Sequence, residues 1–74
     1  MSEIKQEPRI QVIDRAVALL EAISRYPDPV RLKILSAETG LHTSTTHRIL
    51  NSLMDNGLVE KEPSGHYRLG VKLL

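Results

Sequence analysis

Apolar side chains recur three or four residues apart in three stretches of the chain, which is the spacing that places them on one face of a helix. The first stretch covers about residues 11–26, and Pro27 and Pro29 end it because proline cannot continue a helix and disfavours helix in the residue before it. The second and third stretches cover residues 32–39 and 43–56. The pattern therefore predicts three helices, each burying one face.

The first predicted helix carries a broad apolar face. Its inward stripe is expected to comprise Ile13, Ala16, Val17, Leu20 and Ile23. Val12 and Leu19 widen this stripe sideways. Two interpretations stay open for this pair: the two side chains belong to the core, or they form an apolar margin that a second subunit covers.

A tight turn joins the second and third predicted helices. Gly40 ends the second helix, where the backbone commonly turns left-handed and glycine has no steric penalty. Ser36 faces the predicted crossing point, and its small side chain lets the third helix approach closely. The hydroxyl of Thr43 or Ser44 is expected to cap the third helix by accepting a backbone N–H of its first turn. Residues 32–51 thus have the layout of a helix-turn-helix.

The third helix leaves one polar face outside. Its inward side is expected to hold Thr46, Ile49, Leu50 and Leu53. Its outward side then holds Ser44, Thr45, His47, Arg48 and Asn51. These residue types suit base reading in the major groove, because arginine can contact guanine, and asparagine adenine, through two hydrogen bonds. An ordinary solvated face uses similar residues but usually mixes both charge signs, whereas residues 43–47 contain no acid.

The rest of the chain predicts a β-hairpin. Residues 58–62 alternate like a strand, residues 63–65 (Pro-Ser-Gly) turn the chain, and residues 66–69 return. Val59, Tyr67 and Leu69 are expected to face inward. A hairpin that follows a helix-turn-helix is a wing, which can lie along the sugar-phosphate backbone or in the minor groove. The predicted backbone contacts, on the wing and at the starts of the second and third helices, are Arg31, Lys33, Thr43, Lys61, Ser64, His66 and Arg68.

Arg31 and Lys33 need a separate explanation, because a cation at the start of a helix opposes the helix dipole. A nearby phosphate would rationalise both side chains. Flexible surface cations that contact nothing are the ordinary alternative, and this alternative stays open.

Composition limits the protein to one small domain. The 74 residues include no cysteine, Trp or Phe, so aliphatic side chains build a modest core without disulfides or thiolate metal sites. Residues 1–9 contain charges and a proline instead of a signal peptide's apolar run, and no stretch is long enough to span a membrane. A disordered tail and a cytoplasmic location are expected. Because the net charge is only +1, one copy should bind duplex DNA weakly, and dimerisation is expected.

Two other function classes fit the residues less well. For catalysis, Ser44 and His47 lie one turn apart, but no carboxylate is spaced to orient the imidazole. For a metal site, His42 and His47 do not share a helical face and have no third ligand nearby. We therefore expect neither enzymatic activity nor a cofactor. A stronger alternative is a winged helix that docks a protein partner through the same face, and the salt dependence of binding separates the two.

Four segments of the chain, in this order and spacing, resemble the N-terminal winged helix-turn-helix domain of the IclR family of bacterial transcriptional regulators. They are Ile13-Asp14-Arg15-Ala16, Glu38-Thr39-Gly40-Leu41, Ser44-Thr45-Thr46-His47-Arg48-Ile49-Leu50 and Tyr67-Arg68-Leu69-Gly70. The resemblance covers nearly all of the chain after Arg9. The fold it implies is mainly α with a small β-hairpin, a three-helix winged helix-turn-helix.

The resemblance also implies features beyond this domain. Residues 71–74 would begin a linker helix to a C-terminal domain that binds a small-molecule effector and is missing here, and the full-length protein would be a homodimer or tetramer. Two positions depart from the family's pattern: Thr46 stands where an aliphatic residue is usual, and His42 stands where proline is common. The Thr46 hydroxyl is expected to bond back to the His42 carbonyl, and neither departure touches the reading face.

Overall fold

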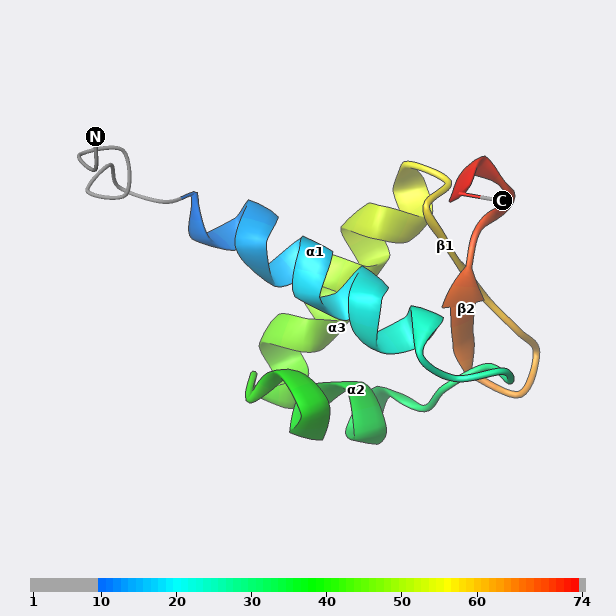
Figure 1. The fold of residues 1–74 in the computed structure, drawn as a ribbon, viewed down its shortest axis with the longest axis horizontal. Helices are drawn as coiled ribbons and strands as arrows, with labels where there is room; N and C mark the ends of the chain where they lie inside the picture. The colour runs from blue at the N-terminus through cyan, green and yellow to red at the C-terminus, as the bar shows by residue number, and fades with distance from the viewer. Residues whose placement is uncertain (1–9, 74) are drawn as a thin grey trace.

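The structure, a computed structural model, describes residues 10–73, so the predicted N-terminal tail lies outside the described residues. Figure 1 shows α1 lying across α3, with α2 near the beginning of α3 and the hairpin on the other side. The predicted fold class, mainly helical with a small β-hairpin, is confirmed. In chain order the elements are α1 (Gln11–Ser24), α2 (Leu32–Thr39), α3 (Thr43–Asp55), β1 (Val59–Lys61), β2 (Tyr67–Leu69) and the short 3-10 helix η2 (Val71–Leu73).

The helix ends follow from local sequence. α1 ends at Ser24, two residues earlier than predicted, because Tyr26 precedes Pro27 and is thereby disfavoured in a helix. At the end of α3, Gly57 adopts a left-handed φ of 76° and donates its N–H to the Met54 carbonyl at 3.0 Å. This left-handed glycine ends α3 and turns the chain toward β1.

The core lies where the three helices and the hairpin meet. On α1 the buried residues are Leu19, Ala22 and Ile23, whereas Ile13 and Val17 are 57% and 46% exposed. The predicted inward stripe is therefore wrong at these two positions. Both side chains border a groove between α1 and α3 instead of the core, and Figure 1 shows the N-terminal end of α1 projecting beyond the other helices.

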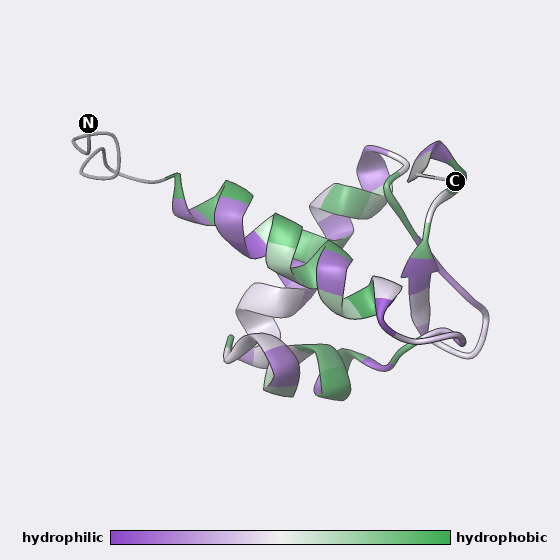
Figure 2. Ribbon diagram, viewed as in Figure 1, coloured by the Kyte–Doolittle hydropathy of each residue, from purple (hydrophilic) through white to green (hydrophobic). Residues whose placement is uncertain are grey.

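Of Val12 and Leu19, one belongs to the core and the other to an exposed apolar margin. Leu19 is completely buried and belongs to the core, while Val12 is 56% exposed. Figure 2 shows the apolar patches on the projecting half of α1. A margin of exposed apolar side chains thus continues outward from the core, and its members are Ile10, Val12, Ile13 and Val17.

The inner faces of the other helices agree with the sequence pattern. α2 buries Leu35 and Ser36. α3 buries the four predicted residues, Thr46, Ile49, Leu50 and Leu53. Neither helix, nor α1, is long and apolar enough to cross a membrane, and the same holds for all of residues 10–73.

The hairpin pairs β1 with β2 in an antiparallel register in which Glu60 lies opposite Arg68. Val59 and Tyr67 are buried, as predicted, and Leu69 is half-buried. Val30 adds a bridge on the other edge of β2, exchanging two backbone hydrogen bonds with Tyr67 at 2.7 and 2.8 Å. The wing is therefore joined to the loop before α2.

Candidate nucleic-acid interface

The turn between α2 and α3 sets the angle at which α3 is presented. Gly40 has a φ of 73° and donates its N–H to the Ser36 carbonyl at 2.9 Å, as a left-handed helix end requires. The Ser36 hydroxyl donates to the Leu41 carbonyl, which the sequence reasoning did not foresee. The predicted hydroxyl bond from Thr46 to the His42 carbonyl is present at 2.9 Å. Both buried hydroxyls are thus satisfied within the turn.

The predicted cap of α3 is wrong. Its N-cap residue is His42, which makes no side-chain capping bond, so Thr43 and Ser44 already lie inside the first turn. A hydroxyl in the first turn no longer has the N-cap geometry that reaches the following backbone N–H groups. Both side chains are exposed instead, at the end of α3 nearest α2.

The outer face of α3 gathers polar side chains. Within residues 10–73, the side chains of Ser44, His47, Arg48 and Asn51 are exposed and form no hydrogen bond or ion pair with the rest of the chain. Thr45 is half-buried between them and the core. Four of the five predicted base-reading residues therefore keep all their donors and acceptors available to an outside ligand.

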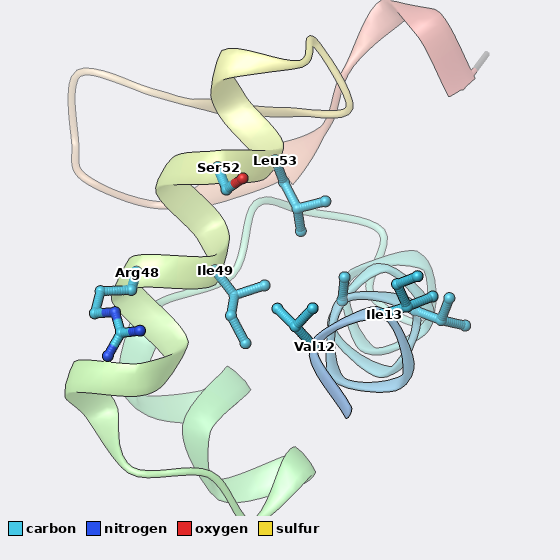
Figure 3. A pocket seen from close by; sticks show the side chains of 8 residues that line it. Val12, Ile13, Arg48, Ile49, Ser52 and Leu53 are labelled. Carbon is cyan, nitrogen blue, oxygen red and sulfur yellow. The ribbon is translucent and has the colours of Figure 1, made fainter. Parts of the chain in front are cut away.

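Figure 3 shows how α3 divides its two sides. Ile49 and Leu53 point toward α1, whereas Arg48 extends on the side away from α1. The helix carries no acid before Asp55 in its last turn. An anionic ligand that approaches the first three turns of α3 therefore meets one cation and several neutral hydrogen-bonding groups.

The first turn of α2 supplies further cations. Arg31 and Lys33 are exposed and make no ion pair within the described part of the chain. Val30 pairs with Tyr67 in antiparallel fashion. The residue after Val30, Arg31, therefore lies beside the residue before Tyr67, His66, at the end of the wing. Two of the predicted backbone-contacting positions, distant in sequence, are thus brought together.

The wing holds its charges differently from the sequence expectation. Arg68 pairs with Glu60 at 2.7 Å and with Glu62 at 2.8 Å. The Lys61 ammonium lies 5.5 Å from the centre of the Tyr67 ring. Of the predicted wing contacts, Arg68 is therefore already neutralised by two carboxylates. The signal that would have shown this is the hairpin register, which sets Glu60 across from Arg68.

A second cluster fixes the end of α1 to the end of α2. The Tyr26 hydroxyl donates to the Glu38 carboxylate, and Arg25 pairs with the same carboxylate at 3.6 Å. The hydrogen bond with Glu38 raises the pKa of Tyr26 above its ordinary value. This contact braces α2 and hence the turn that presents α3.

The histidines considered for a metal site lie apart from other possible ligands in the described part of the chain. Within residues 10–73, no three His, Cys, Asp or Glu side chains come together in a group that could hold a metal ion. His42 and His47 are both exposed on the α2–α3 turn and α3. The surface features that the structure does present are the polar outer face of α3 and the β1–β2 wing.

Comparison with known proteins identifies this arrangement. Residues 12–63 match the family model described as the IclR helix-turn-helix domain. The chain belongs to this family. The DNA-binding transcriptional repressor YiaJ of Escherichia coli K12 is 38% identical over 76 residues, an alignment covering 100% of this chain and 27% of that protein.

Solved IclR structures share the fold. The IclR transcriptional regulator from Alicyclobacillus acidocaldarius superimposes with a TM-score of 0.85 and 25% identity, over 90% of this chain and 28% of that one. An IclR homolog from Microbacterium hydrocarbonoxydans, complexed with 4-hydroxybenzoate, gives a TM-score of 0.77 and 26% identity, over 84% of this chain and 26% of that one. The winged helix-turn-helix fold is thereby confirmed.

The family match defines what this chain contributes. It carries the DNA-binding helix-turn-helix domain of IclR-type transcriptional regulators, and the relatives that it matches are regulators of transcription rather than enzymes. The chain spans about a quarter of the length of the curated relatives it matches.

Proposed function

We propose that α3 reads base edges in the major groove of an operator while the wing and the start of α2 contact the backbone, in a bacterial transcriptional regulator. The observation that carries this proposal is the set of unpartnered polar side chains on the outer face of α3. Arg48 would contact guanine and Asn51 adenine, because each side chain can form two hydrogen bonds to those bases. Ser44, Thr45 and His47 would complete the base contacts.

The backbone contacts would come from side chains flanking this face. Arg31 and Lys33 are the strongest candidates, since both are exposed cations without an ion pair in the described chain. Thr43, Lys61, Ser64 and His66 would add contacts at the start of α3 and along the wing. Arg68 would have to exchange Glu60 and Glu62 for a phosphate. We propose that none of these contacts requires a metal or cofactor.

We further propose that the regulator acts in the cytoplasm as a homodimer or tetramer. The support is the margin of exposed apolar side chains on α1, which continues into a groove of about 400 Å³ against α3. Figure 3 shows Val12 and Ile49 facing each other across this groove. A pair of copies would present two recognition helices to two half-sites, and it would double the few phosphate contacts that one copy can make.

The effector would bind outside this chain. The complex of an IclR homolog with 4-hydroxybenzoate supports a small-molecule effector for this regulator. We propose that residues 71–74 lead into a linker helix that connects the present domain to the effector-binding domain.

The experiment that tests base reading compares two arginines in duplex binding. After selection of a preferred duplex from a random library, Arg48→Ala should reduce the preference for that duplex over random DNA by roughly 5- to 150-fold, because a bidentate base contact contributes about 1–3 kcal/mol of discrimination. Arg31→Ala is the matched control, since it should weaken both complexes equally. Unchanged discrimination in Arg48→Ala, or backbone amides of residues 43–51 that do not respond to duplex, would contradict the proposal.

A further inference from the structure

The segment that follows the wing lies in direct backbone contact with the end of α3. Gly70 is buried and donates its N–H to the Leu58 carbonyl at 2.8 Å. A Cβ on residue 70 would lie 2.2 Å from the Gly57 carbonyl oxygen, so glycine alone permits this approach. The side chain of Lys72 packs over the same turn, with its Cδ 3.2 Å from where a Cβ on Gly57 would lie. Residues 70–72 are therefore packed against the turn that ends α3.

Glu60 on β1 joins this segment to the wing. One carboxylate oxygen, Oε2, accepts the Val71 backbone N–H at 3.3 Å. The other, Oε1, pairs with the Arg68 guanidinium at 2.7 Å. Glu62 offers a natural comparison, because its carboxylate also pairs with Arg68 but its partner in the described chain is Arg68 alone. One carboxylate thus contacts both the wing and the first residue of η2.

We propose that Glu60 is a positioning residue that couples residues 71–73 to the availability of Arg68 for DNA. The inference rests on the proposed function, in which Arg68 exchanges its carboxylates for a phosphate. The Val71 N–H fixes one carboxylate oxygen and thereby directs the other toward Arg68, and charge-assisted hydrogen bonds of this kind depend on orientation. A displacement of residues 71–73 releases the Glu60 carboxylate and loosens its contact with Arg68, so that Glu62 alone holds the guanidinium and a DNA phosphate displaces it more easily.

The test uses the full 74-residue chain and four variants. Glu60→Ala removes both contacts of the carboxylate, and Glu62→Ala makes the same charge change without touching Val71. Val71→Pro removes the N–H donor without changing any charge; proline is well tolerated at the first position of a helical turn, and Val71 is exposed. The double variant Glu60→Ala/Val71→Pro completes a thermodynamic cycle.

Measurements without DNA examine the contact itself. The Val71 amide should exchange about two- to fivefold faster in Glu60→Ala, as expected for loss of one exposed hydrogen bond, and at the wild-type rate in Glu62→Ala. The Arg68 Nη resonances, which report the contact with Glu60, should shift in Val71→Pro, and the double variant should shift them no further than Glu60→Ala does. Equal Val71 exchange in the two acid variants, or additive shifts at Arg68, would overturn the proposal.

Measurements with duplex DNA separate this inference from the proposed function. Val71→Pro leaves every charge in place, yet it should tighten duplex binding about twofold or more and steepen the loss of affinity with salt, as one further phosphate contact would. If the wild-type chain binds duplex and Val71→Pro binds it with the same Kd and the same salt dependence, the coupling through Glu60 is refuted and the proposed function is not. A wild-type chain that binds no duplex would refute the proposed function.

Discussion

Replacing Gly70 with alanine adds one methyl group where two backbone segments lie against each other. That methyl carbon would lie 2.2 Å from the Gly57 oxygen and 3.0 Å from the carbonyl carbons of Gly57 and Leu58. An acceptable carbon–oxygen distance is about 3.3 Å, so the two backbone segments must separate by about 1 Å. The separation also stretches the 2.8 Å hydrogen bond from Gly70 to the Leu58 carbonyl.

The cost of this substitution follows from those two changes. Overpacking contributes about 1–3 kcal/mol and the weakened hydrogen bond about 1 kcal/mol, so we expect a loss of about 2–4 kcal/mol. A domain of this length has a free energy of unfolding of roughly 4–11 kcal/mol, and the substitution removes a large share of it. Urea unfolding followed by circular dichroism should show a midpoint lower by about 2 M or more.

Gly40→Ala provides the control for Gly70→Ala. Gly40 has a left-handed φ of 73°, but a Cβ there would meet no atom within 4 Å, so only the backbone penalty of about 1–2 kcal/mol applies. Amide shifts should change around Gly57 and the wing in Gly70→Ala, and around the α2–α3 turn in Gly40→Ala. If Gly70→Ala were less destabilising than Gly40→Ala, the steric reasoning would be refuted.

Two further predictions concern the supports of α3. Thr46→Val should change the free energy of unfolding by less than about 1 kcal/mol, because the His42 carbonyl keeps its bond to the residue 46 N–H at 2.9 Å and valine fills the same space; a larger loss in urea unfolding would show that the hydroxyl stabilises the turn. Because the Glu38 hydrogen bond raises the pKa of Tyr26 in the folded state, its contribution is complete below the unfolded pKa and is lost as pH rises through the folded pKa. Tyr26→Phe should therefore flatten the alkaline end of the stability profile, and an unchanged profile would contradict this.

Helical periodicity predicted the inner faces of α2 and α3 correctly but misassigned part of α1. Periodicity identifies which side of a helix is apolar, and it does not say how far along the helix a partner extends. Ile13 and Val17 line the open groove between α1 and α3 instead of entering the core, so they are exposed. The sequence could show the apolar stripe, whereas the part of the stripe that enters the core depends on how α1 packs against α3.

The wing illustrates a second limit of the sequence. Arg68 was predicted to contact DNA because a cation on a wing commonly does, and its ion pairs depend on the register that places Glu60 opposite it. A one-residue change in register would move every side chain to the other face, so the pairing is visible only once the turn geometry is known. The roles of individual residues toward DNA stay predictions, because they depend on a ligand and not on the fold.

The bridge between Val30 and Tyr67 has a consequence for the order of folding. It joins two residues separated by the whole helix-turn-helix, so forming it closes a long loop whose entropy must be overcome before the wing is held. A two-stranded hairpin alone is marginally stable in water, and this bridge gives β2 a neighbour on both edges. The wing therefore becomes ordered only with the rest of the domain, and slow exchange of the Tyr67 amide should report global rather than local opening.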